Sequence, residues 1–147
     1  MTSPRRQRRQ RRQHSQHRRP PSPLPLSLSR YALALFFSVA GLLHFIFPAA
    51  YAAIMPPWLP APLLLVYVSG ACELAGGIGL LPARTRRLAG IGLIALSLAV
   101  LPANVQMLLN ARAAGDPAWQ QALLLARLPL QAALVWWIWK VSRQAGR

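Results

Sequence analysis

Two charged residues stand inside otherwise apolar stretches of the sequence. Glu73 lies in the apolar run 63–81 and Arg127 in the apolar run 119–139. A charged side chain inside a membrane helix costs about 2.5–3.5 kcal/mol on insertion scales, so each needs a polar partner. If both runs are helices that enter a membrane from the same side, Glu73 and Arg127 lie at depths of ~15 Å and ~12 Å at ~1.5 Å per residue. We therefore predict that the two residues face each other as an ion pair or within one hydrogen-bond network.

Three further polar side chains belong to the same expected site. His44 lies near the end of an apolar run, Asn104 follows Pro102 in another, and Gln131 is four residues after Arg127 and so shares its helix face. The polar centre expected inside one half of a helix bundle consists of Glu73, Arg127, Gln131, Asn104 and His44. Two interpretations stay open. The polar groups fix the register and order of the helices, or they bind a ligand, a proton or a quinone.

Few other residues could support catalysis. Cys72 is the only cysteine, which excludes a disulfide, a CxxC redox pair and a cysteine zinc site within the chain. A single membrane histidine, His44, does not make a bis-histidine haem site. The sequence has no phosphate-binding loop, nucleophile elbow or metal motif. We predict no catalytic residue and no metal site, and we do not expect the isolated chain to be an enzyme.

The polar residues are carried by apolar runs whose lengths are typical of membrane spans. Each run is close to the roughly 20 residues that cross the hydrocarbon layer. Backbone groups must find their partners within a spanning segment, so the runs are expected to be helices. The sequence thus predicts an all-α, four-transmembrane-helix bundle with helices at 27–47, 63–81, 88–109 and 119–139. Around Glu73, the small residues Ser69, Gly70, Gly76 and Gly77 would allow another helix to approach closely.

The net charge of +15 is concentrated in an N-terminal tail. Residues 1–26 are rich in Arg, Gln, Ser and Pro and have little to bury, so we expect a disordered basic tail. The membrane domain would then span residues 27–140, followed by a short basic tail at 141–147. Such a tail can contact nucleic acid, attract anionic lipid or fix topology. Topology or lipid is favoured because membrane segments follow, and nucleic acid is not the expected partner.

The placement of the cationic residues predicts the orientation. The tail with Arg30, the turn 82–87 and the C-terminal end together carry fifteen Lys and Arg residues, whereas the connectors 48–62 and 110–118 carry one, Arg112. Positive charge is retained on the cytoplasmic side, so both termini are expected there, in the inner membrane of a bacterium. The apolar run before Ala50-Tyr51-Ala52 is too long for a usual signal peptide, and the first helix is therefore retained.

The connector Pro48–Pro62 is uncharged, rich in proline and apolar, unlike an ordinary aqueous loop. It is expected to lie at the membrane interface, with Trp58 as an anchor, or to cap the polar centre. A stiff connector without either role is the alternative.

Several segments spread over roughly residues 31–140 together carry a family resemblance: GLLHF at Gly41–Phe45, PPWLP at Pro56–Pro60, SGACELAGGIGLLPARTRRLA at Ser69–Ala89, PANVQM at Pro102–Met107 and RLPLQ at Arg127–Gln131. In this order and spacing they resemble the DoxX-like family of small four-helix integral membrane proteins. It implies a four-helix membrane bundle, with relatives linked to quinone-dependent sulfur oxidation or to membrane complexes that handle oxidative stress. The cysteine-pair chemistry of more distant relatives does not carry over, because Cys72 has no partner. The long arginine tail departs from the family's short N-terminus.

The preferred hypothesis is an accessory or ligand-binding membrane subunit, with quinone as the candidate ligand. One alternative is a membrane subunit of a quinone-linked oxidoreductase, which would need a redox partner protein because this chain shows no redox centre of its own. Another is a small proton-coupled transporter that uses Glu73, although no inverted repeat is evident. The lipid bilayer is the expected environment, and a second copy of the chain is a further candidate partner.

Overall fold

The computed structural model describes residues 26–143. The predicted tail 1–26, apart from Leu26, lies outside these residues, as do positions 144–147 of the C-terminal tail. The described part contains helices and no strand: α2 (Leu26–Ile46), α3 (Pro48–Ala52), α4 (Pro62–Gly79), α5 (Arg86–Ala99), α6 (Leu101–Ala113) and α7 (Ala118–Ser142). Four stretches are long and apolar enough to cross a membrane: Leu28–Ile46, Pro62–Gly79, Arg86–Ala113 and Ala118–Ser142. The prediction of an all-α bundle with four membrane helices is confirmed.

The third spanning segment is two helices rather than the single run 88–109. The break lies at Val100, between α5 and α6, and Pro102 stands at the start of α6. Proline has no backbone N–H and therefore cannot continue the hydrogen-bond ladder of the preceding helix. The Leu98 carbonyl, four residues before Pro102, consequently cannot accept the usual helical bond from residue 102, although the Leu96 carbonyl still accepts from Val100 N at 3.0 Å. This break sets the direction of α6 and exposes backbone acceptors inside the bundle.

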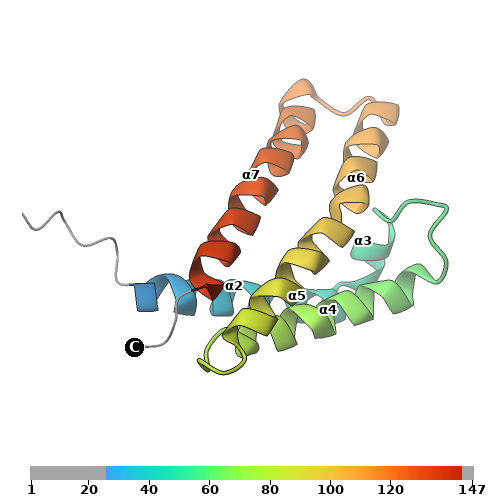
Figure 1. Ribbon diagram of the computed structural model, residues 1–147. Coiled ribbons are helices and arrows are strands. Elements are labelled where there is room, and N and C mark those ends of the chain that lie inside the picture. The colour runs from blue at the N-terminus through green and yellow to red at the C-terminus, as the bar shows by residue number, and fades with distance from the viewer. Residues whose placement is uncertain (1–25, 144–147) are drawn as a thin grey trace, which may run out of the picture.

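The helices form two pairs that share one end of the molecule. α2 packs along α4, and α6 packs along α7, while α5 contacts both α4 and α7. Figure 1 shows the two pairs diverging from the end where α4 turns into α5 and α7 finishes. The start of α2 lies at the same end, as an even number of crossings requires.

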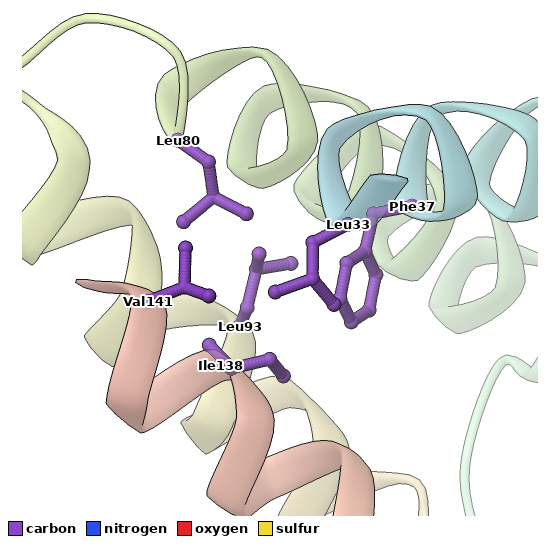
Figure 2. Close-up of a cluster of buried hydrophobic side chains, with 6 residues drawn as sticks. All are labelled: Leu33, Phe37, Leu80, Leu93, Ile138 and Val141. Carbon is purple, nitrogen blue, oxygen red and sulfur yellow. The ribbon is translucent and has the colours of Figure 1, made fainter. Parts of the chain in front are cut away.

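The hydrophobic core lies at this shared end. It consists of the buried residues Leu33, Phe37, Leu80, Leu93, Ile138 and Val141. These side chains come from α2, the turn after α4, α5 and the last turns of α7, and Figure 2 shows them pointing toward one another. Arg86 strengthens the turn, because its Nε donates to the Leu80 carbonyl at 3.2 Å and its Nη2 to the Leu81 carbonyl at 3.3 Å. The core therefore fixes the shared end and leaves the other ends of the two pairs apart.

Glycines bring the backbones of α2 and α4 into direct contact. A Cβ added at Gly41 would lie 2.6 Å from the Gly70 carbonyl oxygen, and one added at Gly70 would lie 2.9 Å from the Gly41 carbonyl oxygen. A Cβ at Gly77 would lie 2.9 Å from the Ala34 carbonyl oxygen. Small residues permit this approach in membrane helices, where van der Waals packing drives association. The expectation that the small residues around Glu73 admit a neighbouring helix is confirmed.

Candidate functional site

A cavity of about 1190 Å³ lies between the two helix pairs. One wall comes from α2, α3 and α4, and the other from α5, α6 and α7. All five residues of the predicted polar centre line it: His44, Glu73, Asn104, Arg127 and Gln131. The structure thus brings together, on the walls of one cavity, side chains from four different helices.

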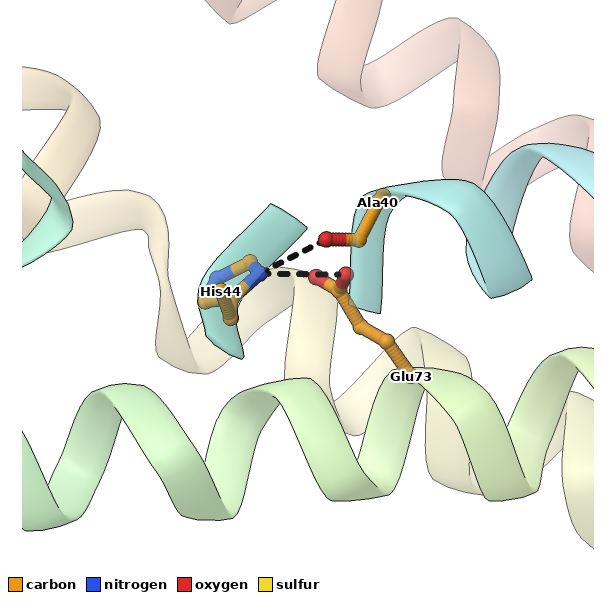
Figure 3. A network of polar contacts seen from close by, with 3 residues as sticks. All are labelled: Ala40, His44 and Glu73. Carbon is orange, nitrogen blue, oxygen red and sulfur yellow. Dashed lines mark hydrogen bonds and ion pairs between the residues drawn. The ribbon is translucent and has the colours of Figure 1, made fainter. Parts of the chain in front are cut away.

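On the first wall, His44 stands beside Glu73. His44 Nδ1 lies 2.9 Å from the Ala40 carbonyl oxygen, to which it donates, and 3.6 Å from Glu73 Oε2 (Figure 3). Glu73 Oε2 is buried and has no hydrogen-bond partner within the part of the chain that the structure describes. The close approach of Gly41 and Gly70 places these two side chains together, since the helices carry them on adjoining turns. Neither helix by itself contains a signal for this pair, and sequence reasoning missed it.

The prediction that Glu73 and Arg127 form an ion pair or share a hydrogen-bond network is wrong for the described residues. The ion-pair partner of Glu73 among the described residues is His44, and Arg127 Nη1 instead donates to Met107 Sδ at 2.8 Å. Glu73 and Arg127 were expected at similar depths in the membrane, but a similar depth does not determine how far apart two helices lie within the plane of the membrane. α4 belongs to one helix pair and α7 to the other, and the cavity lies between them.

On the second wall, one amide joins three helices. Asn104 Nδ2 of α6 donates to Gln131 Oε1 of α7 at 2.8 Å. Gln131 Nε2 donates in turn to the backbone carbonyl of Ser97, which is among the last four carbonyls of α5. Gln131 therefore satisfies an acceptor left by the helix break and holds both sides of that break against α7.

The connector after α2 supplies a residue that sequence reasoning did not assign to the site. Tyr51 of α3 lines the cavity, and its ring stacks on the His44 ring with centroids 3.9 Å apart and an angle of 23° between the planes. Burial raises the pKa of the Tyr51 phenol, the charge of Glu73 raises it further, and the charge of Arg127 lowers it. The phenol therefore stays protonated at neutral pH and can donate a hydrogen bond. Ala50, Ile54 and Met55 line the cavity beside it, so the first half of this connector forms part of the cavity wall.

The rest of the cavity is mainly apolar. Aromatic and aliphatic side chains continue from the polar centre toward the shared end of the helix pairs: Phe36, Phe37, Leu130, Leu134, Trp136 and Trp137. A molecule with a polar head and an apolar body finds matching surfaces in that order. Within residues 26–143, no three His, Cys, Asp or Glu side chains are grouped closely enough to hold a metal ion.

Taken together, the fold and the cavity define a four-helix membrane protein with a partly polar internal site. A family model described as a domain of unknown function, DUF8561, matches residues 33–142. The chain therefore belongs to the DUF8561 family. Neither the curated proteins nor the solved structures contain a significant match to it.

Proposed function

We propose that this protein is a ligand-binding, accessory membrane subunit whose cavity takes up a lipid-soluble molecule with a polar head. The observation that carries the proposal is the convergence of His44, Glu73, Asn104, Arg127 and Gln131 on one cavity of about 1190 Å³. Ligand sites are generally concave and mainly apolar, at roughly 300–1,000 Å³, with a few convergent polar groups. A purely structural role for these residues does not require a cavity between them.

A quinone is the ligand that the resemblance to DoxX-like proteins suggests. Its ring carbonyls are acceptors, and the guanidinium of Arg127 and the phenol of Tyr51 are donors on the cavity wall. Its isoprenoid tail matches the apolar part of the lining. In that case a redox partner protein would supply or remove electrons.

Binding can be measured by quenching of Trp136 and Trp137, which line the cavity. We expect a short-chain quinone to quench the fluorescence of the purified full-length protein saturably. Ala133 lines the cavity and its neighbour Ala132 does not, although both side chains are exposed. Ala133→Phe fills the cavity and should weaken binding by about tenfold or more, an effect of about 1.4 kcal/mol. Ala132→Phe is the matched control and should bind as the wild type does. Non-saturable quenching, or equal binding by the two variants, contradicts the proposal.

We also propose that both termini lie in the cytoplasm and that the membrane is a bacterial inner membrane. The shared end of the bundle carries the cationic residues around the α4–α5 turn and at the end of α7. Lys140 Nζ lies 4.9 Å from the Trp136 ring centroid and Arg143 Cζ 4.6 Å from that of Trp139, an arrangement that suits a membrane interface.

Reporter fusions test this orientation. Alkaline phosphatase, which is active only outside the cytoplasm, is expected to be inactive when fused after Arg147 and active when inserted in the connector between α6 and α7. A fluorescent protein that folds only in the cytoplasm should give the opposite pattern. An active phosphatase at the C-terminus would overturn the proposed orientation.

A further inference from the structure

Arg127 is a cation on the cavity wall with very little to satisfy it. Its side chain is exposed to the cavity, near the middle of α7. Its hydrogen bond among the described residues is the one from Nη1 to Met107 Sδ, at 2.8 Å. A thioether is a weak acceptor, whereas a guanidinium offers several N–H donors. Most of the donor capacity of Arg127 is therefore directed at the cavity.

Neither of the two acidic side chains of the sequence contacts this cation. Glu73 and Asp116 are its only acidic residues. Glu73 pairs with His44, and Asp116 Oδ2 accepts from Gln120 Nε2 at 2.9 Å near the start of α7. An arginine at membrane depth is costly and is ordinarily paired with an anion or directed into a polar cavity. An anion that pairs with Arg127 would therefore come from outside the chain.

We propose that Arg127 binds the ionised head of an acidic lipid, a long-chain carboxylate that enters the cavity from the bilayer. This inference rests on the proposed function in one respect, that the cavity binds a ligand, and it narrows the head group to an acid. A guanidinium matches a carboxylate with two parallel N–H···O bonds, and the pair is stronger than a neutral hydrogen bond. One guanidinium also neutralises one carboxylate, which fits a single-chain acid.

The neighbours of Arg127 determine where the chain of such a lipid lies. Leu130, Leu134 and Trp137 follow Arg127 at intervals of three and four residues, so they share its helix face, and all three line the cavity. The acyl chain therefore runs from Arg127 along α7 toward the shared end. The carboxylate stays on the α7 wall, away from the carboxyl group of Glu73 on the opposite wall.

The test compares four forms of the full-length protein in detergent micelles at about pH 8, where a fatty acid is ionised. The probes are a fatty acid brominated near the middle of its chain, which quenches tryptophan on contact, and its methyl ester. Arg127→Gln removes the charge. Arg127→Lys keeps the charge but loses the planar guanidinium that makes two parallel hydrogen bonds to a carboxylate. Arg112→Gln removes a cation from the end of α6, where Arg112 does not line the cavity, and is the matched control.

We expect the wild type and Arg112→Gln to bind the acid equally and saturably. Arg127→Gln should bind it about ten- to hundredfold more weakly, the range expected for loss of one charge-assisted bond pair, and Arg127→Lys should be intermediate. The ester should bind weakly to all four forms. Because Arg127→Lys retains the charge, it reports on head-group geometry even if Arg127→Gln does not fold.

Three outcomes would overturn the inference: equal acid affinity in wild type and Arg127→Gln, equal affinity for acid and ester, or displacement of the acid by a similar concentration of acetate. The last would indicate a site for small free carboxylates rather than for a lipid. If any of these holds while the quinone still binds in an Ala133-dependent manner, the proposed function survives alone. If neither probe binds, both proposals fail.

Discussion

Gly70→Ala is expected to destabilise the bundle by about 1–3 kcal/mol, the usual range for inserting a methyl group into a closely packed interface. The new Cβ would lie 2.7 Å from His44 Cβ, 2.9 Å from the Gly41 carbonyl oxygen and 3.0 Å from Phe45 Cε2. One of these neighbours is backbone and another is the first carbon of a side chain, so neither can move away without shifting a helix. The α2–α4 contact is the most extensive in the protein, and this shift would propagate along it.

The effect can be measured as the free energy of unfolding in mixed micelles, followed by circular dichroism as the fraction of denaturing detergent rises. Gly92→Ala is the matched control, because no atom lies within 4 Å of a Cβ added there. Gly92 is also inside a helix, so its replacement should be neutral or slightly stabilising. Equal stability of Gly70→Ala and Gly92→Ala would show that α2 and α4 do not approach as closely as described.

The same substitution should affect the site. His44 would be displaced by the new methyl group, and the distance of 3.6 Å between His44 Nδ1 and Glu73 Oε2 would lengthen. Binding of a ligand that contacts His44 and Glu73 should therefore weaken. The glycine contact thus links helix packing to the geometry of the cavity.

The membrane spans could be predicted from sequence because hydropathy and length are local properties. Predicted and observed helices differ by a few residues at their ends, as for 63–81 and Pro62–Gly79. The break at Val100 has a visible cause in Pro102, but proline is tolerated inside membrane helices, as Pro129 within α7 demonstrates. The sequence therefore could not decide between a kink and a break.

The residues that line the cavity were easier to predict from the sequence than the contacts between them. An ionisable or amide side chain in an apolar run generally faces the bundle interior because it is costly in hydrocarbon, and the five predicted residues line one cavity. Gln106 also lies in an apolar run but does not line the cavity. Which of them touch depends on which helices pair. That order is set by surfaces such as the Gly41–Gly70 contact, and matching depths along α4 and α7 gave no information on it. Tyr51 was missed because it lies in a connector, where an aromatic residue ordinarily indicates only the interface.

Gln131→Leu is expected to lower the free energy of unfolding by about 1–3 kcal/mol, because it leaves two hydrogen-bonding partners of Gln131 unsatisfied. Asn104 Nδ2 would lose Gln131 Oε1 as its acceptor. The Ser97 carbonyl would lose Gln131 Nε2, which donates to it in place of a helical N–H group. Both hydrogen bonds are only partly buried, which limits the penalty to that range. Asn104→Leu should cost less, since the bond from Gln131 Nε2 to Ser97 remains.

The pair Asn104–Gln131 can be separated from the rest by a double-mutant cycle. The double variant Asn104→Leu with Gln131→Leu is expected to cost less than the sum of the single variants, with a coupling energy of about 0.6–1.7 kcal/mol, the range measured for hydrogen bonds between membrane helices. Gln106→Leu is the control, because Gln106 Nε2 bonds only along its own helix, to Asn110 Oδ1 at 2.8 Å. The free energy of unfolding of Gln106→Leu should stay within about 0.5 kcal/mol of the wild-type value, as expected for a site outside the interhelical contacts.

The stability of Gln131→Leu shows whether the hydrogen bonds of Gln131 or helix packing alone fix the angle between α5 and α6. If Gln131 holds the break against α7, its loss should destabilise the protein and also increase protease or hydrogen-exchange access around the break between α5 and α6. A stability equal to that of Gln106→Leu, with unchanged exchange at the break, would mean that packing alone fixes the direction of α6. In that case the second wall of the cavity would not depend on the amide that now joins its three helices.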